Sequence, residues 1–420
     1  MTAEPTAESL AEPKRAGLAL TFILITVTLD AIGIGLIFPV MPDLIGEVTG
    51  GDLSQAAIWG GLLATSYAVM QFLFGPIVGS LSDRFGRRPI LLTSLAIMVA
   101  DYLVMAAAST IWILLAARIV AGITSATYST ASAYIADITP PENRAQRFGL
   151  IGAGFGVGFV LGPAIGGLLA TFDTRAPFYA AAAMAAANLA FGAVVLPETV
   201  TARLRRSFSL ARANPLGALR SVSRLPGLRR PLLVFLILGI AMNVYPSVWA
   251  FFGKARFGWD TGMVGFSLAI YGISFAVGQV VLVGPLIRRF GEHRAAVYGM
   301  WVDITTLAAL GFVTSGTLAL AIIPVTALGG VVTPALQAIL SRGAAEDAQG
   351  ELQGVLASLT AVASITAPLM MTSVFSAFTA PGANVHNPGA PFLLASVLMV
   401  ACVLLHVAGP RETRAPRTIA

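Results

Sequence analysis

The segment that organises this chain reads GSLSDRFGRR at residues 79–88, and a related segment, GPLIRRFGEH, occupies residues 284–293. Both contain an Arg-Phe-Gly core, and each comes at the end of a long apolar stretch, at 56–80 and at 262–287. A second apolar stretch follows each segment. The repeat predicts that the chain consists of two related halves, in which this segment joins the second hydrophobic stretch to the third.

The composition excludes an ordinary soluble protein. Of the 420 residues, 56% are hydrophobic and 11% are charged, and the mean hydropathy is +0.83. Soluble domains carry about 25% charged residues, so this chain has too few to cover a surface that faces water. Apolar stretches of about 20 residues, long enough to cross a bilayer as a helix, recur along it. The dyad alternation of a membrane barrel is missing. We therefore expect an all-α membrane protein.

Twelve transmembrane helices are predicted, in two pseudo-symmetric halves of six. Their expected limits are 17–40, 56–80, 90–108, 111–136, 146–171 and 176–196, then 231–252, 262–287, 294–313, 318–341, 350–378 and 390–409. The first stretch is too long for the apolar part of a cleavable signal peptide, so we expect it to remain. The corresponding domains are an N-terminal tail (1–16), a first bundle (17–198), an Arg-rich linker (199–230), a second bundle (231–409) and a C-terminal tail (410–420).

Lys and Arg are distributed unevenly between the two sides of this array. Of the 26 basic residues, all except Arg118, Arg175, Lys254 and Arg256 fall on the tails, in the linker or in loops on the same side. Basic loops remain in the cytoplasm. The pattern predicts a multi-pass protein of the cell (inner) membrane with both termini and the linker cytoplasmic. It also explains the net charge of +6 without nucleic acid as a partner.

Metal and cofactor chemistry is not expected. The single cysteine, Cys402, excludes a disulfide framework, and the histidines His293, His386 and His406 are scattered along the chain. We expect no metal, no cofactor and no enzymatic activity, because the sequence also lacks clustered catalytic groups. An ATP-driven pump would require a Walker A motif, which is absent.

Four ionisable residues lie inside the predicted helices: Asp30, Asp101, Arg118 and Asp303. A charge within the bilayer is costly, so each one indicates a substrate or ion pathway. A carboxyl group in an apolar cavity can exchange protons near neutral pH, which predicts proton coupling through Asp30, Asp101 and Asp303. The alternative is structural, with an ion pair between Asp101 and Arg118.

Polar and aromatic side chains in these helices are candidates to bind a flat amphiphilic substrate. The polar candidates are Gln71, Asn243 and Gln279, together with Arg118, and the aromatic ones are Tyr67, Phe72, Tyr245, Trp249, Tyr271, Phe275 and Trp301. The amides could equally bond one helix to another. The aromatic rings could pack in the core or contact lipid.

Glycines follow one face of the fifth predicted helix. Gly154, Gly158, Gly162 and Gly166 are spaced four residues apart and allow another helix to approach closely. Pro163 leaves a carbonyl of this helix without its usual donor and permits a bend. We expect close helix packing here, with a gating role added to it.

With these motifs, the chain resembles the major facilitator superfamily and, within it, the drug/proton antiporters of the tetracycline efflux family. The resemblance covers residues 20–400 and rests on LDAIGIGLIFPVMP (29–42), GSLSDRFGRRP (79–89), ADYLVM (100–105), ARIVAGIT and AYIADIT (117–139), GFGVGFVLGPAIGG (154–167) and PALQ (334–337). It implies that two halves rock about a central site and exchange a cytoplasmic drug for external protons.

The resemblance also implies a gate in the loop after the second helix. Asp83 would cap the start of the eleventh helix, and Arg87 would reach Asp137 at the end of the fourth, which together would hold the outward-open state. Alternatively, Arg84, Arg87 and Arg88 fix only the topology.

The membrane residues Asp30, Asp101, Arg118 and Asp303 match equivalent positions of tetracycline pumps, and so does Gln279. One departure stands out, since Phe275 replaces a histidine of those pumps. Its loss predicts weak or absent tetracycline transport and a site built from aromatic and amide groups.

The expected partners are a small molecule, protons and the lipid bilayer, and we expect a monomer. Two other kinds of protein remain open. A proton-linked uptake carrier would have the same architecture and is disfavoured by the glycine motif alone. A receptor of transporter ancestry would bind its ligand without counterflow.

Overall fold

The computed structural model describes residues 7–125, 127–200, 217, 222, 225 and 227–408. Most of the predicted linker and the C-terminal tail from residue 410 lie outside the described residues, as do residues 1–6 of the predicted N-terminal tail. Twelve helices of the described part are long and apolar enough to cross a membrane, and no strand occurs there. The predicted all-α architecture of twelve transmembrane helices is confirmed.

The first half is built from seven helices that make six spans. They are α1 (Ala7–Thr49), α2 (Leu53–Phe85), α3 (Arg87–Ala107), α4 (Ile111–Thr124) with α5 (Thr127–Ile138), α6 (Arg144–Ala170) and α7 (Ala176–Val195). The first helix is longer than predicted at both ends. It begins within the predicted N-terminal tail, at Ala7, and continues to Thr49. A short 3-10 turn, Pro141–Asn143, precedes α6.

The second half repeats this pattern with more interruptions. Its spans are α9 (Arg229–Met242) with α10 (Val244–Phe257), α11 (Thr261–Val281) with α12 (Val283–Phe290), α13 (Glu292–Phe312), α14 (Gly316–Thr326) with η3 (Ala327–Val331) and α15 (Val332–Gly343), α16 (Gln349–Thr379) and α17 (Ala390–Val407). The α9–α10 break has a local cause, because Pro246 has no N–H to donate to the preceding turn. In η3 the pair Gly329–Gly330 weakens the helix.

The repeated Arg-Phe-Gly core has the same conformation in both halves. Gly86 ends α2 with φ 113° and ψ 155°, and Gly291 ends α12 with φ 75° and ψ 162°. Only glycine adopts this backbone region readily. The same turn therefore joins the second and third spans of each half, which supports the pseudo-symmetry predicted from the sequence.

The helices α2, α11 and α14 begin at the end of the molecule opposite the two Arg-Phe-Gly turns, and each has a polar N-cap. The Asp52 carboxylate accepts hydrogen bonds from Ser54 Oγ at 2.6 Å and from the Gln55 backbone N–H at 2.9 Å. These two bonds lower the pKa of the Asp52 carboxyl group. Asp260 and Ser315 cap α11 and α14 in the same way. Such caps satisfy backbone donors that the first helical turn leaves free.

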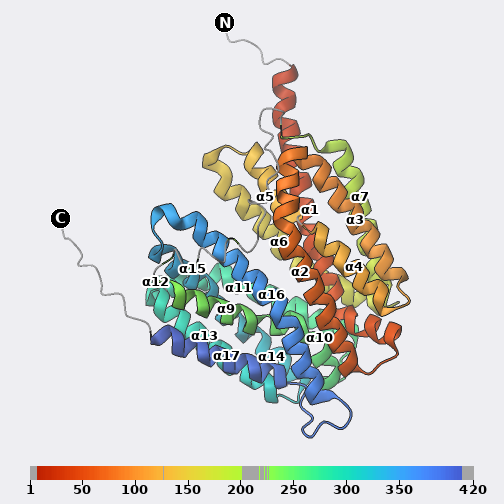
Figure 1. Ribbon diagram of the computed structural model, residues 1–420, viewed down its shortest axis with the longest axis vertical. Helices are drawn as coiled ribbons and strands as arrows, with labels where there is room; N and C mark the ends of the chain where they lie inside the picture. The colour runs from red at the N-terminus through yellow and green to blue at the C-terminus, as the bar shows by residue number, and fades with distance from the viewer. Residues whose placement is uncertain are drawn as a thin grey trace, which may run out of the picture.

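The two six-span halves meet at one end of the molecule and diverge toward the other (Figure 1). We call the end where α7 stops and α9 begins the linker end, and the end with residues 50–52 the closed end. At the closed end, backbones cross between the halves: a Cβ on Gly61 would lie 3.2 Å from the Leu369 Cα, and one on Gly167 would lie 2.9 Å from the Gly265 Cα.

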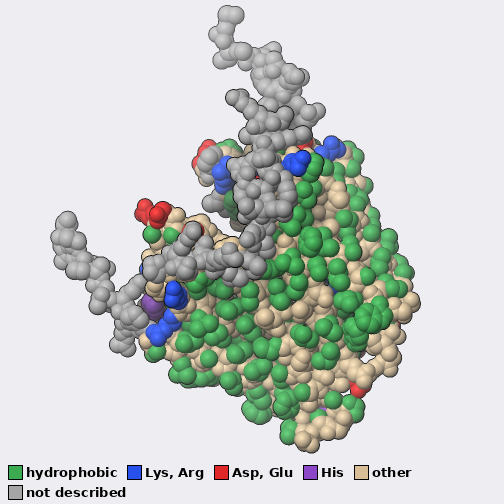
Figure 2. All heavy atoms as spheres, viewed as in Figure 1, with side chains coloured by type: hydrophobic (Ala, Val, Ile, Leu, Met, Phe, Trp, Pro, Cys, Tyr) green, Lys and Arg blue, Asp and Glu red, His purple; other side chains and the backbone are tan. Residues whose placement is uncertain are grey.

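The outer surface suits a lipid environment. Hydrophobic side chains cover the sides of the molecule, and Lys and Arg gather at the linker end (Figure 2). Large apolar residues are exposed on these sides, among them Trp112, Val194, Val280 and Leu404. In water this surface would be unfavourable, so the chain is a multi-pass membrane protein.

Candidate functional site

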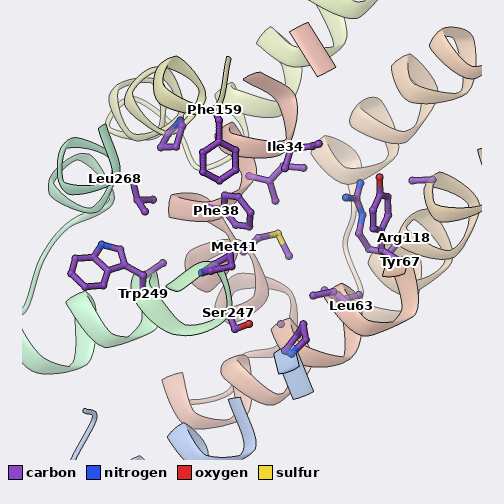
Figure 3. Close-up of a pocket in the computed structure, with 18 of the residues that line it drawn as sticks. Ile34, Phe38, Met41, Leu63, Tyr67, Arg118, Phe159, Ser247, Trp249 and Leu268 are labelled. Carbon is purple, nitrogen blue, oxygen red and sulfur yellow. The ribbon is translucent and has the colours of Figure 1, made fainter. Parts of the chain in front are cut away.

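A cavity of about 400 Å³ lies between the two halves. The first half contributes residues of α1 to α6, and the second half contributes residues of α10, α11, α14 and α16, with Met242 from the end of α9. Most of the lining is apolar or aromatic, as Figure 3 shows for Phe38, Met41, Phe159, Trp249 and Leu268. Because the site exists only between the halves, a relative movement of the halves would change its access.

One wall of the cavity is charged. Arg118 donates a hydrogen bond to Asp101 Oδ2, and the side chains are 12% and 5% exposed, respectively. The guanidinium carbon lies 5.8 Å from the centroid of the Tyr67 ring, and Figure 3 shows these two side chains side by side. The predicted Asp101–Arg118 pair is therefore present, and it lines the cavity.

This ion pair keeps unused hydrogen-bonding capacity. Asp101 Oδ1 and Arg118 Nε are buried and have no hydrogen-bond partner among the described residues. Buried polar atoms normally have partners. The pair therefore contains a buried acceptor and a buried donor that a rearrangement of the cavity wall could use.

Asp30 of α1 lies in the same cavity and is half-buried. Its carboxylate makes no hydrogen bond or ion pair with any described residue. The next turn of α1 touches α3, since a Cβ on Gly33 would lie 2.8 Å from Tyr102 Cζ. The cavity therefore holds one paired carboxylate, Asp101, and one unpaired carboxylate, Asp30.

The opposite wall is a group of aromatic rings from α10 and α11. The rings of Tyr245 and Tyr271 stack with centroids 5.5 Å apart, and Trp249 Nε1 donates to Ser267 Oγ at 2.8 Å. The Tyr245 hydroxyl is buried and lacks a partner among the described residues. This wall offers the flat faces of three aromatic side chains, Tyr245, Trp249 and Tyr271.

Asp303 lies outside the cavity lining. It is 4% exposed on α13 and packs on η3, where a Cβ on Gly329 would lie 2.9 Å from its Oδ2. Gln279 Nε2 donates to the neighbouring Gly330 carbonyl at 3.0 Å, and a Cβ on Gly330 would lie 3.1 Å from the Phe275 ring. Asp303, Gln279 and Phe275 thus gather around the interrupted tenth span.

Other predicted binding residues also lie outside the lining. Gln71 is exposed on α2 and Trp301 is 51% exposed. The Asn243 amide donates to the Gly239 carbonyl of its own helix at 2.8 Å. Phe275 stacks on Tyr271 with centroids 6.1 Å apart but does not line the cavity. Of the residues predicted to bind substrate, those that line the cavity are Tyr67, Arg118, Tyr245, Trp249 and Tyr271.

Several lining residues were missed from the sequence. On α1, Ile34, Phe38 and Met41 follow Asp30 at helical spacing and line the cavity with it. Residues three, four or seven apart share one face of a helix. The sequence could therefore have indicated these three residues, because they share the helix face of Asp30. Phe159, within the glycine run of α6, had no such signal.

The glycine motif of the fifth span packs against α1. A Cβ on Gly162 would lie 2.9 Å from the Gly35 Cα, and one on Gly166 would lie 3.0 Å from the Leu36 Cα. Gly154 and Gly158 face Thr28 and the turn that follows it. Close packing of another helix on this face is therefore present. Pro163 of the same helix lines the cavity, so α6 connects the packing face to the site.

At the linker end, Arg87 joins the loop after α2 to α5. Its guanidinium pairs with Asp83 at 2.5 Å and with Asp137 at 3.2 Å. The predicted contact of Arg87 with Asp137 is thus present. Arg88 donates to the Ala193 carbonyl at 2.7 Å, and Arg84 lies over the Phe85 ring.

The cap predicted for Asp83 on the eleventh span, which is expected in the outward-open state, is not made in this conformation and stays a prediction for the other one. The hollow around Asp83 is lined by residues of the first half alone, from α2, α3, α5 and residues 199–200. The physical reason is the separation of the halves at the linker end, which leaves Arg87 as the partner of Asp83. The conformation of this structure is therefore open at the linker end (Figure 1).

Glu198, which follows α7, was not predicted to have a role. Its carboxylate accepts hydrogen bonds from the backbone N–H groups of Arg87 at 2.9 Å and Arg88 at 3.2 Å, and from those of Thr199 and Val200 at 2.9 Å. A carboxylate at a helix N-terminus satisfies free donors and meets the positive end of the helix dipole. Glu198 therefore fixes the start of α3 and the loop that carries Arg87.

Comparisons with known proteins agree with this architecture. The profile of the Major Facilitator Superfamily matches residues 23–368. The class C tetracycline resistance protein of Escherichia coli is 45% identical over 92% of this chain and 95% of its own length. The class G protein of Vibrio anguillarum is 40% identical over 90% and 95%. A crystal structure of the nucleoside transporter NupG, 12% identical, covers 93% of this chain and 98% of its own with a TM-score of 0.74.

Proposed function

Since this chain belongs to the major facilitator superfamily, and is therefore a membrane transporter and not an enzyme, we propose that it exports a small amphiphilic drug in exchange for protons by alternating access. The observation that carries this proposal is the cavity between the halves. It has an aromatic wall on one side and an ion pair on the other.

The cavity suits a flat molecule with one polar edge. Its volume of about 400 Å³ is within the range of drug-sized sites. The faces of Tyr245, Trp249 and Tyr271 would cover fused rings. The Asp101–Arg118 pair would face the polar edge. Tetracycline has this form.

Phe275 bears less on the substrate than the sequence suggested. It lies behind Tyr271, outside the cavity lining. The expectation of weak tetracycline transport came from the missing histidine at this position, and this position does not line the cavity in this conformation. Together with the names of the two resistance proteins, this favours tetracycline as the first substrate to test.

For proton coupling we propose the carboxylates within the membrane. Asp30 and Asp101 line the cavity, where a substrate and a proton would compete for the same groups. Asp303 sits beside the interrupted tenth span, where gain or loss of a proton would act on helix geometry. A charge moved through 100 mV is worth about 2.3 kcal/mol. One proton can therefore support a substrate gradient of about fiftyfold, since a tenfold gradient costs about 1.4 kcal/mol.

The proposed orientation places the linker end and both termini in the cytoplasm of a cell with this chain in its inner membrane. It rests on the basic residues at that end. The conformation described above would then accept drug from the cytoplasm. The opposite conformation would open the closed end and release the drug outside. We propose that a monomer performs this cycle.

The test uses inverted membrane vesicles, in which an exporter carries drug inward. Vesicles with this chain should accumulate tetracycline when a proton gradient is present, and a protonophore should abolish the accumulation. Accumulation in right-side-out vesicles instead would identify an uptake carrier and refute export. Binding without flux in either preparation would indicate a receptor and refute transport.

A further inference from the structure

A salt bridge joins the two halves at the closed end. Lys254, in the last turn of α10, lies with its Nζ 2.9 Å from Asp43 Oδ2 of α1. Lys254 Nζ also donates to Thr261 Oγ1 at 3.0 Å, and the Thr261 hydroxyl donates to the same Asp43 oxygen. Three side chains from α1, α10 and α11 thus form one closed set of contacts.

Other ion pairs of the described residues stay within one half. Arg118 pairs with Asp101 in the first half, and Arg342 pairs with Glu292 in the second. At the closed end, Arg175 lies 3.8 Å from Glu47, and both belong to the first half. The contact of Lys254 with Asp43 differs because any separation of the halves at this end must break it.

Partial burial and a helix dipole strengthen this ion pair. The Lys254 side chain is 14% exposed and that of Asp43 is 37% exposed, so solvent screens the pair less than it screens a fully exposed one. The cation also sits at a helix C-terminus, where the dipole favours it. When the halves separate, both charges can return to water, so the contact is reversible.

The surrounding contacts are of a different kind. Where Gly167 meets Gly265 and Gly61 meets Leu369, the backbones nearly touch. Such packing is non-directional. One turn along α2 from Gly61, the Thr65 hydroxyl donates an uncharged hydrogen bond to the Ile365 carbonyl of α16 at 3.0 Å. Asp43, Lys254 and Thr261 therefore supply a charged, directional contact across this seam.

From this arrangement we propose that Asp43, Lys254 and Thr261 form a latch that holds the closed end shut and must break before substrate leaves there. The idea that the latch breaks before substrate release rests on the proposed function. The idea that it holds the closed end shut concerns the conformational equilibrium alone. Removal of either charge shifts that equilibrium toward molecules open at the closed end, because a ligand-free protein populates its states by their relative free energies.

The experiment measures the distance across the closed end in nanodiscs without substrate. Spin labels are placed at Ser109→Cys in the loop after α3 and at Val385→Cys in the loop after α16, in a Cys402→Ala background. Lys254→Gln and Asp43→Asn should each raise the ratio of long to short distances by about tenfold, as expected for loss of a hydrogen bond between charged groups. Arg175→Gln is the matched control and should leave the ratio unchanged.

A charge-exchanged variant, Asp43→Lys with Lys254→Asp, distinguishes loss of the ion pair from disruption of the fold. It should return most of the population to the short distance. Unchanged distances in both single variants, or an exchanged pair as open as the single variants, would overturn the latch. Neither result depends on transport. A shift in distance without drug export would leave the latch standing and refute the proposed function.

Discussion

The replacement of Asp101 by Asn tests whether the charged wall of the cavity is a true buried ion pair. The change keeps the shape of the side chain and removes its charge, which leaves Arg118 as a cation that is 12% exposed. Loss of one partner of a buried pair costs about 3 to 5 kcal/mol. The Asn amide can still accept one hydrogen bond, so the lower part of this range is expected.

The corresponding change in melting temperature follows from the chain length. An unfolding entropy of about 2.1 cal/mol/K per residue amounts to about 0.9 kcal/mol/K for 420 residues. Asp101→Asn should therefore lower the melting temperature by about 3 to 5 °C. The measurement is a thermal unfolding scan of the purified protein in detergent, followed by tryptophan fluorescence.

A double variant separates the ion pair from other effects. Asp101→Leu with Arg118→Met removes both charges and should melt no more than about 1 °C below the parent protein, since replacement of a whole buried pair by apolar groups of similar size is often neutral or stabilising. Arg175→Gln breaks the more exposed Arg175–Glu47 pair and the hydrogen bond to the Ala106 carbonyl, and should destabilise the protein less than Asp101→Asn because its charges are better solvated. An unchanged melting temperature for Asp101→Asn, or a double variant as unstable as the single one, would refute the reasoning.

Single substitutions at Asp303, Gly162 and Glu198 test proton coupling, close helix packing and the cap of α3. Asp303→Asn should abolish proton-driven drug accumulation yet leave drug binding by tryptophan quenching unchanged, because Asp303 does not line the cavity; weakened binding would contradict this. Gly162→Ala should reduce transport at least about tenfold because its methyl group would lie 2.9 Å from the Gly35 Cα, whereas Gly156→Ala, whose methyl group meets nothing within 4 Å, should transport normally. Glu198→Gln should make the amides at the start of α3 exchange hydrogen faster by about fivefold, consistent with loss of a charged cap; unchanged exchange would remove the positioning role.

The sequence predicts the fold well because bilayer solvation acts on each span separately. Any helix that crosses hydrocarbon must be apolar over about 20 residues, and this requirement is visible without knowledge of its neighbours. The repeated Arg-Phe-Gly core also carries its own conformation, since Gly86 and Gly291 each adopt a backbone that other residues avoid. Interruptions such as η3 were missed because glycines are common in transmembrane helices and only some of them break one.

The cavity was harder to predict because it depends on the rotation of each helix about its axis. Gln71 and Trp301 are polar or aromatic residues in the right spans, but their helices turn them outward. Composition does not fix this rotation, whereas packing against neighbours does. Asp30 and Asp101 were found because a charge tolerates few positions in a membrane, so chemistry alone restricted them to the interior.

The separation of Asp303 from the cavity sets a condition on how protons and drug could be coupled. In the proposed mechanism, a substrate in the cavity would displace protons from Asp30 and Asp101, and that competition would need no long-range effect. Asp303 touches η3 at Gly329, and α14, which precedes η3, supplies Ile323 to the cavity lining. Coupling through Asp303 therefore requires that the tenth span change shape between protonation states. A 3-10 segment with two glycines is a place where such a change costs little, because its hydrogen bonds are poorer than those of an α-helix.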